Sequence, residues 1–243
     1  GRVGSPIVTE QAVNTRRQRR LGLVTVGGGC SGTLINRYWV LTADHCVASN
    51  PQVFGSPDAP FANKRITATW TSKTATPTRY VRYWNARGLD VALVFLGNGD
   101  LGSVDRKLIY HDEVDTSMTL TKFGQGLCSF ATAGPPAQAA QSNCGYRVAA
   151  FTPSSASATG IVLPISGGQV GHGGDSGGPD YVTDGDGNLL GIASVQSTCN
   201  WTGMVPGRTF AVDGWPWVTG IASCSSAALL YLRDDIHERM KEA

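Results

Sequence analysis

Short apolar runs separated by small and turn-forming residues recur along most of the chain. They are Leu21–Val26, Thr33–Leu41, Arg65–Trp70, Val91–Leu96, Met118–Phe123, Gly160–Leu163 and Leu189–Val195. Runs this short, bounded by Gly, Pro, Asn and Ser, predict strands joined by tight turns. No repeat with a period of about 20–50 residues is present, which argues against a solenoid or a propeller. We therefore expect an all-β protein.

The pattern changes toward the C-terminal end. Asp213 is placed to cap a short helix that runs through Trp217 and Ile221. A second helical pattern extends from Ser225 to Met240, and its apolar positions are Leu229, Leu232, Ile236 and Met240. We expect this second helix to pack its apolar face on the body of the protein rather than on a membrane. The basic stretch at residues 16–20 is interpreted as a surface loop rather than a processing site.

Composition supports a turn-rich β protein and excludes several partner classes. The 243 residues include 31 glycines and 12 prolines, and only 16% of them are charged. This length suits one structural unit made of two lobes. The net charge of +2 is too small to indicate a nucleic acid or an anionic membrane as a partner. No apolar run approaches the roughly 18 residues that a membrane-spanning helix needs.

Cysteine usage indicates an oxidising, extracellular setting. The cysteines are Cys30, Cys46, Cys128, Cys144, Cys199 and Cys224. Their number alone leaves the connectivity open. A metal site is the competing interpretation, but no two of them stand in C-x-x-C spacing.

Three short segments carry the candidate chemistry. The run Gly-Asp-Ser-Gly-Gly-Pro at 174–179 contains Ser176, the segment Leu-Thr-Ala-Asp-His-Cys at 41–46 contains His45, and the segment Gly-Leu-Asp-Val-Ala-Leu at 88–93 contains Asp90. A serine hydroxyl becomes a useful nucleophile only when a histidine takes its proton and a carboxylate orients that imidazole. Asp90 stands in an apolar segment, where a carboxylate is costly unless it is paired.

A different serine site also fits residues 174–178, because they match the G-x-S-x-G nucleophile elbow of α/β-hydrolases. That fold needs a helix directly after the serine and a later acid and histidine. Here Pro179 follows, the next segment is predicted as a strand and turn, and the only later histidine is His237. An α/β-hydrolase esterase is therefore disfavoured, and it would differ in its abundant helix.

The three segments resemble those of the chymotrypsin-like (trypsin-like) serine peptidase family in order and spacing. The resemblance extends to two further segments. The block at 30–35, followed by 39–42, is similar to the strand pair before the family's histidine, and Gly191–Ser194 is similar to the family segment after the serine. It implies an all-β fold of two six-stranded antiparallel β-barrel lobes, with the active site in the cleft between them and a C-terminal helix. The expected single peptidase domain, 1–243, has an N-terminal lobe at about 21–105, a C-terminal lobe at about 106–212 and a helical segment at 213–243.

The resemblance also implies roles for individual residues. His45, Asp90 and Ser176 would be catalytic, and the backbone N–H groups of Gly174 and Ser176 would bind the oxyanion. Ser194 would stand behind Asp90, and the following residues, Val195 and Gln196, would offer a strand edge to the substrate backbone. The resemblance pairs Cys30 with Cys46, and we pair the remaining neighbours, Cys128 with Cys144 and Cys199 with Cys224. No cofactor or metal is implied.

Three positions depart from the family pattern. Val170 stands at the base of the primary pocket, where a trypsin has aspartate, so we expect no preference for Lys or Arg at P1. The expected activated N-terminus is missing, and Ile7 is the nearest match, so either a further cut before Ile7 or another cation would supply the partner of Asp175. Asp44 stands where the family usually has alanine. We expect it to be either an extra hydrogen-bond acceptor in the histidine loop or a turn residue.

The sequence thus predicts a secreted serine endopeptidase that works through an acyl-enzyme on Ser176. Its partners would be polypeptide substrates, with protein inhibitors left open, and it would be a monomer with neither nucleic-acid nor membrane partners. The alternative is a catalytically silent or latent peptidase-like binding protein.

Overall fold

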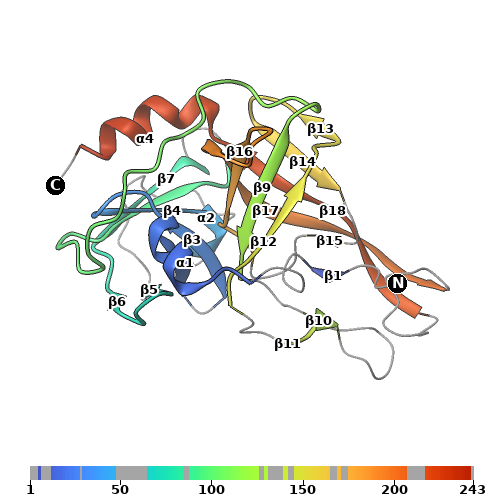
Figure 1. Ribbon diagram of the computed structural model, residues 1–243, viewed down its shortest axis with the longest axis horizontal. Coiled ribbons are helices and arrows are strands. Elements are labelled where there is room, and N and C mark those ends of the chain that lie inside the picture. Colours follow the sequence, from blue (N-terminus) through green and yellow to red (C-terminus); the bar gives the residue numbers. More distant parts are fainter. Residues whose placement is uncertain are drawn as a thin grey trace.

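Two antiparallel sheets, one from each half of the chain, make up most of the protein (Figure 1). The computed structural model describes residues 12–27, 29–47, 65–84, 88–125, 145–164, 175–206 and 217–241, with short strands at 5–6, 129–130, 139–141 and 169–170. For these short strands and for 199–222 it describes the backbone only. The all-β prediction is confirmed.

The first sheet contains the strands of the N-terminal half. In spatial order it consists of β6 (Thr74–Ala75), β5 (Ile66–Ala68), β2 (Leu23–Val26), β3 (Cys30–Leu34), β4 (Trp39–Thr42), β8 (Ala92–Phe95) and β7 (Arg79–Arg82). The predicted run at 33–41 is divided between β3 and β4. Asn36 causes the break, because its Oδ1 accepts from the N–H groups of Tyr38 (3.0 Å) and Trp39 (2.9 Å) and closes a turn.

The second sheet contains the strands of the C-terminal half. In spatial order it consists of β12 (Arg147–Phe151), β9 (Thr119–Gly124), β16 (Pro179–Thr183), β17 (Leu189–Pro206), β18 (Trp217–Ala228), β14 (Gly160–Pro164) and β13 (Ser155–Ala156). Each sheet thus has seven strands where the resemblance implies six, and each ends on a two-residue edge strand, β6 or β13. The remaining strands form two small pairs: β1 (Ser5–Pro6) with β15 (Gln169–Val170), and β10 (Ser129–Phe130) with β11 (Ala139–Gln141).

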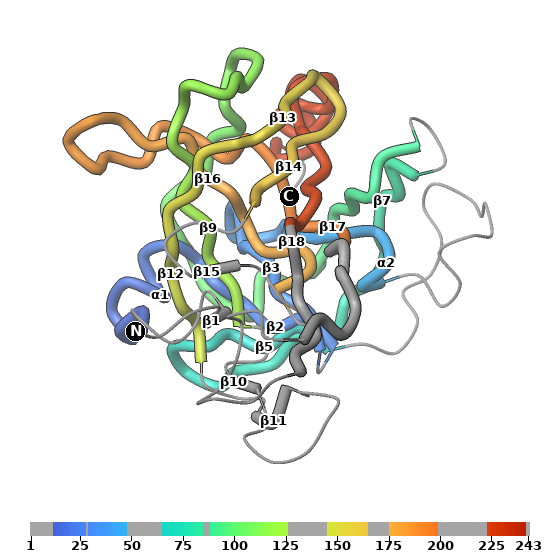
Figure 2. Tube along the Cα trace, turned by 90° about the vertical axis from the view of Figure 1, so that its right-hand side faces the viewer, coloured from blue at the N-terminus to red at the C-terminus, as the bar shows by residue number. Residues whose placement is uncertain are grey.

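The basic stretch at 16–20 is helical, so the prediction of a surface loop is wrong for its backbone. It forms α1 (Thr15–Leu21; Figure 2), which Asn14 caps by accepting from the N–H of Arg17 at 2.8 Å. Gly22 ends the helix in the left-handed conformation, with φ 67°. Local capping residues therefore decide this element, although only Leu21 of the helix is buried.

The C-terminal helical prediction is wrong in its first part. Trp217 and Ile221 lie in β18, and so do Ser225 to Ala228. This strand is hydrogen-bonded between β17 and β14, and such long-range pairing overrides a weak local helical pattern. Helix begins only at η1 (Leu230–Leu232) and continues as α4 (Arg233–Arg239).

The packing predicted for the second helix is confirmed. Its apolar positions are Leu229, Leu232, Ile236 and Met240. All four belong to the core cluster that also contains strand residues of both sheets. Polar contacts hold α4 to the N-terminal half. Tyr83 donates its hydroxyl to Asp235, and Asn36 Nδ2 donates to the Met240 carbonyl at 2.8 Å. None of the helices among the described residues is long and apolar enough to cross a membrane.

Candidate active site

His45 and Asp90 meet at one end of the first sheet. His45 lies in α2 (Asp44–Val47), a single turn directly after β4, and Asp90 lies in the turn before β8. Asp90 holds the histidine twice, because its Oδ1 accepts from the His45 backbone N–H at 2.9 Å and its Oδ2 lies 2.6 Å from Nδ1. The Asp90 side chain is 14% exposed and the His45 side chain is 31% exposed. The aspartate is thus enclosed while the imidazole reaches solvent.

This contact decides which nitrogen of His45 carries the proton. An ionised carboxylate only accepts hydrogen bonds, so Nδ1 must donate, and in the neutral ring Nε2 then carries the lone pair. Burial by itself would raise the pKa of Asp90, but the hydrogen bond and charge of His45 and the hydroxyl of Ser197 hold it below its ordinary value. The geometry therefore presents an ionised carboxylate beside an imidazole whose free nitrogen is basic.

The residue behind Asp90 is Ser197, which the sequence interpretation missed. Its Oγ donates to Asp90 Oδ2 at 2.6 Å. The motif Gly-Ile-Ala-Ser had pointed to Ser194, but Ser194 is fully buried and donates to Asp180 Oδ2 at 2.7 Å. No local signal distinguishes the two serines, because only the register of β17 decides which one faces the first sheet.

Val195 and Gln196 do not form the open strand edge that was expected to bind the substrate backbone. Val195 lies opposite Pro179 of β16 and opposite Ala227 of β18, so its strand is paired on both sides. Gln196 is 1% exposed, and its backbone exchanges hydrogen bonds with the loop after Ser176. Neither residue therefore lies at an open edge. Beyond Gln196, the described partner of β17 is β18 alone, which leaves the edge that begins at Ser197 without a described strand beside it.

Ser176 lies where the two sheets meet. Its carbonyl accepts from the Ser31 N–H of β3 at 2.8 Å, and the next residue, Gly177, donates to the Gln196 carbonyl at 2.8 Å. Within the described residues, Ser176 Oγ donates to the Ser197 carbonyl at 3.3 Å and makes no hydrogen bond with His45. Strands from both halves of the chain therefore set the position of this serine.

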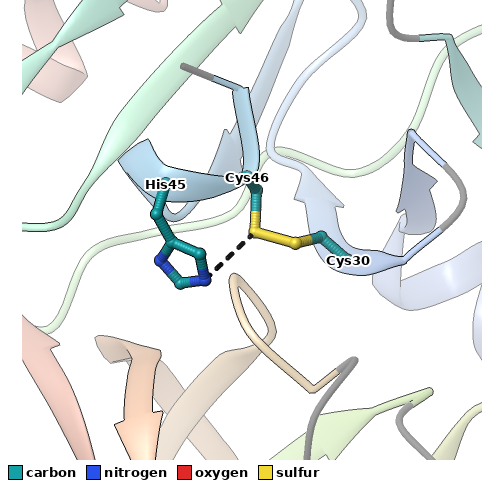
Figure 3. Close-up of side chains that lie close together, drawn as sticks. All are labelled: Cys30, His45 and Cys46. Atoms are coloured by element: carbon teal, nitrogen blue, oxygen red, sulfur yellow. Dashed lines mark hydrogen bonds between the residues drawn. A yellow bond between two sulfur atoms is a disulfide. The ribbon is translucent and has the colours of Figure 1, made fainter. Parts of the chain in front are cut away.

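The predicted Cys30–Cys46 disulfide is confirmed and lies against the histidine. Its Cα atoms are 5.9 Å apart, and it ties α2 to β3. Figure 3 shows the imidazole beside this bridge, with His45 Nε2 3.9 Å from Cys46 Sγ. The same sulfur lies 3.6 Å from the Ser176 carbonyl oxygen. The bridge thus lies between the histidine turn and the backbone of the serine loop.

The other predicted disulfides are described in part. Cys224 is disulfide-bonded, and Cys199 is its directly opposed residue across β17 and β18. Cys128 and Cys144 lie outside the described residues, so their pairing stays a prediction. Among the described residues, the one group with metal-ligand geometry is Cys30, His45 and Cys46, and both of its sulfurs belong to the disulfide.

Asp44 is an extra hydrogen-bond acceptor in the histidine loop, which is the first of the two expected alternatives, and its donor is the distant Arg82. Asp44 is 1% exposed and forms an ion pair with Arg82, the last residue of β7, with Nε 2.8 Å from Oδ1. Sequence reasoning had no signal for this partner, because Arg82 is distant in the chain and lies in an ordinary strand.

The activation and pocket residues are described only in part. Asp175 is fully buried, and its carboxylate lies so close to Gly124 that a Cβ there would be 2.1 Å from Oδ1. Gly174 and Ile7 lie outside the described residues. Only the backbone of Val170 is described, and it pairs with Pro6 of β1.

Comparisons with known proteins agree with this geometry. The family model described as Trypsin matches residues 7–213. No curated protein matches the chain. Among solved structures, neuropsin, a serine protease expressed in the limbic system of mouse brain, gives a TM-score of 0.61 at 14% identity over 95% of this chain and 98% of that chain. At this low identity the structural likeness shows a shared fold alone, whereas the family match covers most of the sequence. The chain therefore belongs to the trypsin family.

Proposed function

We propose that this protein is a secreted serine endopeptidase that cleaves peptide bonds through an acyl-enzyme on Ser176. His45 takes the proton of the serine hydroxyl and then protonates the leaving amine. Asp90 keeps the imidazole in the Nδ1–H form and stabilises the imidazolium that develops. Backbone N–H groups of Gly174 and Ser176 bind the oxyanion.

The observation that carries this proposal is the pair of hydrogen bonds between Asp90 and His45. The carboxylate accepts from the histidine backbone N–H through Oδ1 and from Nδ1 through Oδ2, and Ser197 also donates to Oδ2. A structural histidine does not require that a single carboxylate accept from both its backbone N–H and its ring N–H. The serine hydroxyl points to the Ser197 carbonyl in the free protein, and catalytic hydrogen bonds often tighten only when substrate binds.

The proposed substrate class and location rest on separate observations. Polypeptide substrates fit the strand edge that begins at Ser197, where an extended peptide adds as a further strand. Valine at 170 offers no charge for a basic side chain, which supports a P1 residue other than Lys or Arg. The disulfide at Cys30 and Cys46 supports an oxidising, extracellular setting. We further propose that the protein acts as a monomer.

Fluorophosphonate labelling tests the proposal directly, because the probe reacts with an activated serine whatever the P1 preference. We expect the wild-type protein to be labelled, and Ser176→Ala and His45→Ala to remain unlabelled. Ser103→Ala, at an exposed position outside the three candidate segments, is the matched control and should label normally. A folded wild-type protein that does not react would instead support the latent or silent peptidase-like binding protein.

A further inference from the structure

A buried ion pair lies beside the histidine of the site. The side chains of Asp44 and Arg82 are 1% and 4% exposed. The contact is bidentate, since Nε donates to Oδ1 and Nη2 donates to Oδ2, each at 2.8 Å. Because both groups are planar, two parallel hydrogen bonds fix their relative orientation as well as their separation.

This pair ties the turn that carries His45 to β7, the strand that pairs with β8 just after Asp90. Asp44 belongs to the same helical turn as His45. Arg82 is paired with Ala92 of β8 in the β7–β8 ladder, and Ala92 comes two residues after Asp90 in the chain. A displacement of α2 relative to these strands would therefore change the distance between His45 Nδ1 and the Asp90 carboxylate.

The histidine turn needs external anchors. α2 has only four residues, and an isolated turn of helix is unstable because nucleation fixes several dihedral angles for one hydrogen bond. Cys46 anchors the turn to β3 through its disulfide with Cys30. The Asp44 carboxylate anchors the preceding residue to β7, so the two anchors hold His45 from both neighbours in the chain.

Stability alone does not account for this pair. Burying two charges costs free energy that their attraction only about repays, and apolar residues of similar volume often serve a fold equally well. The surrounding cluster is apolar and includes Ala43, Val47, Tyr80 and Ala92. What the ion pair adds over an apolar contact is a fixed direction and distance.

We propose that the Asp44–Arg82 pair is a positioning device for His45, which holds α2 at the distance from β8 that keeps Nδ1 on Asp90 and Nε2 available to Ser176. This inference rests on the proposed function, because the imidazole acts as a base only in that reaction. Neither Asp44 nor Arg82 touches the reacting atoms.

The test measures the second-order rate constant of fluorophosphonate labelling at Ser176, and kcat and KM once a peptide substrate is found. We expect Arg82→Met and Asp44→Asn to lower the labelling rate and kcat by about tenfold or more with KM nearly unchanged, since small misplacements of a catalytic group have effects of this size. Arg82→Lys, which keeps the charge without the planar fork, should fall between them and the wild type. The double variant should be no slower than the worse single one, because both remove one interaction.

Two further measurements separate positioning from general destabilisation and from failure of the proposed function. Ile66→Ala weakens the same core cluster without touching the pair, so it should lower stability but leave the rate per folded molecule unchanged. The proton resonance of His45 Nδ1–H reports its bond to Asp90 whether or not the probe reacts, and it should broaden or shift in Arg82→Met. The inference would be overturned if Arg82→Met folds, is labelled at the wild-type rate and leaves the His45 Nδ1–H resonance unchanged. An unlabelled wild type would contradict the proposed function, and the resonance alone would then decide whether the pair positions His45.

Discussion

Ser197 Oγ donates to Asp90 Oδ2 at 2.6 Å, across the junction of the two sheets. The same oxygen lies 2.6 Å from His45 Nδ1, so one carboxylate oxygen receives a donor from each half of the chain. This contact fixes the angle at which the aspartate approaches the imidazole. It also places the C-terminal half of the protein in direct contact with the histidine–aspartate pair.

Ser197→Ala should reduce catalysis, because it removes a hydrogen bond to a charged group, worth about 1.5–3 kcal/mol. We expect kcat/KM for a peptide substrate to fall by about tenfold or more. Ser194→Ala is the matched control: it removes a buried hydrogen bond to Asp180 and should lower the free energy of unfolding with little effect on kcat/KM. An equal loss of activity in both variants would contradict the assignment of Ser197.

Gly177→Ala should displace the serine loop. Gly177 has φ 83°, and a Cβ there would lie 2.2 Å from Thr42 Oγ1 and 2.3 Å from the Ser31 carbonyl oxygen. Backbone on one side leaves little room to relax, so we expect lower thermal stability and slower labelling of Ser176. Gly185→Ala, in the β16–β17 hairpin with nothing within 4 Å of its Cβ position, should leave both unchanged. Unaltered labelling in Gly177→Ala would show that this loop tolerates the shift.

Lys122→Met should destabilise the second sheet strongly. Lys122 Nζ lies 2.6 Å from Asp180 Oδ1, with the two side chains 1% and 0% exposed. Removing the lysine leaves the buried carboxylate with Ser194 as its described donor, and we expect the free energy of unfolding in urea to fall by about 3–5 kcal/mol.

Two variants control this experiment. The double change Lys122→Met with Asp180→Leu should recover much of the loss, because it removes both buried charges. Lys241→Met breaks an ion pair whose side chains are 71% and 73% exposed, and it should change the urea midpoint little. A double variant as unstable as the single one would point to packing rather than charge as the cause.

His237 should make the docking of α4 sensitive to acid. Its Nε2 accepts from the Ile109 N–H at 3.1 Å, which requires a neutral ring. Burial, followed by the charges of Arg233 and Arg106, lowers its pKa below the ordinary value of 6.5. Between that lowered pKa and 6.5 the unfolded chain binds more protons, so stability rises with pH in this window.

The contribution of His237 is thus complete above pH 6.5 and is lost as pH falls through the folded pKa. Thermal unfolding midpoints across this range should show the slope in the wild type. His237→Gln keeps an acceptor for Ile109 and should flatten it. A slope that persists in this variant would assign the pH dependence to another group.

The sequence by itself determined the class of fold and named the three candidate catalytic side chains. Short β-rich runs bounded by turn residues are local features, and so are the segments around His45, Asp90 and Ser176. The burial of the last apolar helix face was likewise readable, because residues such as Leu229 and Ile236 follow a helical period that must be covered.

Only the tertiary structure decided which neighbours these elements meet. The strand at β18, the role of Ser197 in place of Ser194, and the ion pair of Asp44 with Arg82 all depend on pairing between residues far apart in the chain. A local pattern contains no register, and a shift in register changes which residues of a strand face a given neighbour. The sequence does not predict the buried ion pair either, because the local pattern around a strand arginine is the same whether its side chain faces water or a carboxylate.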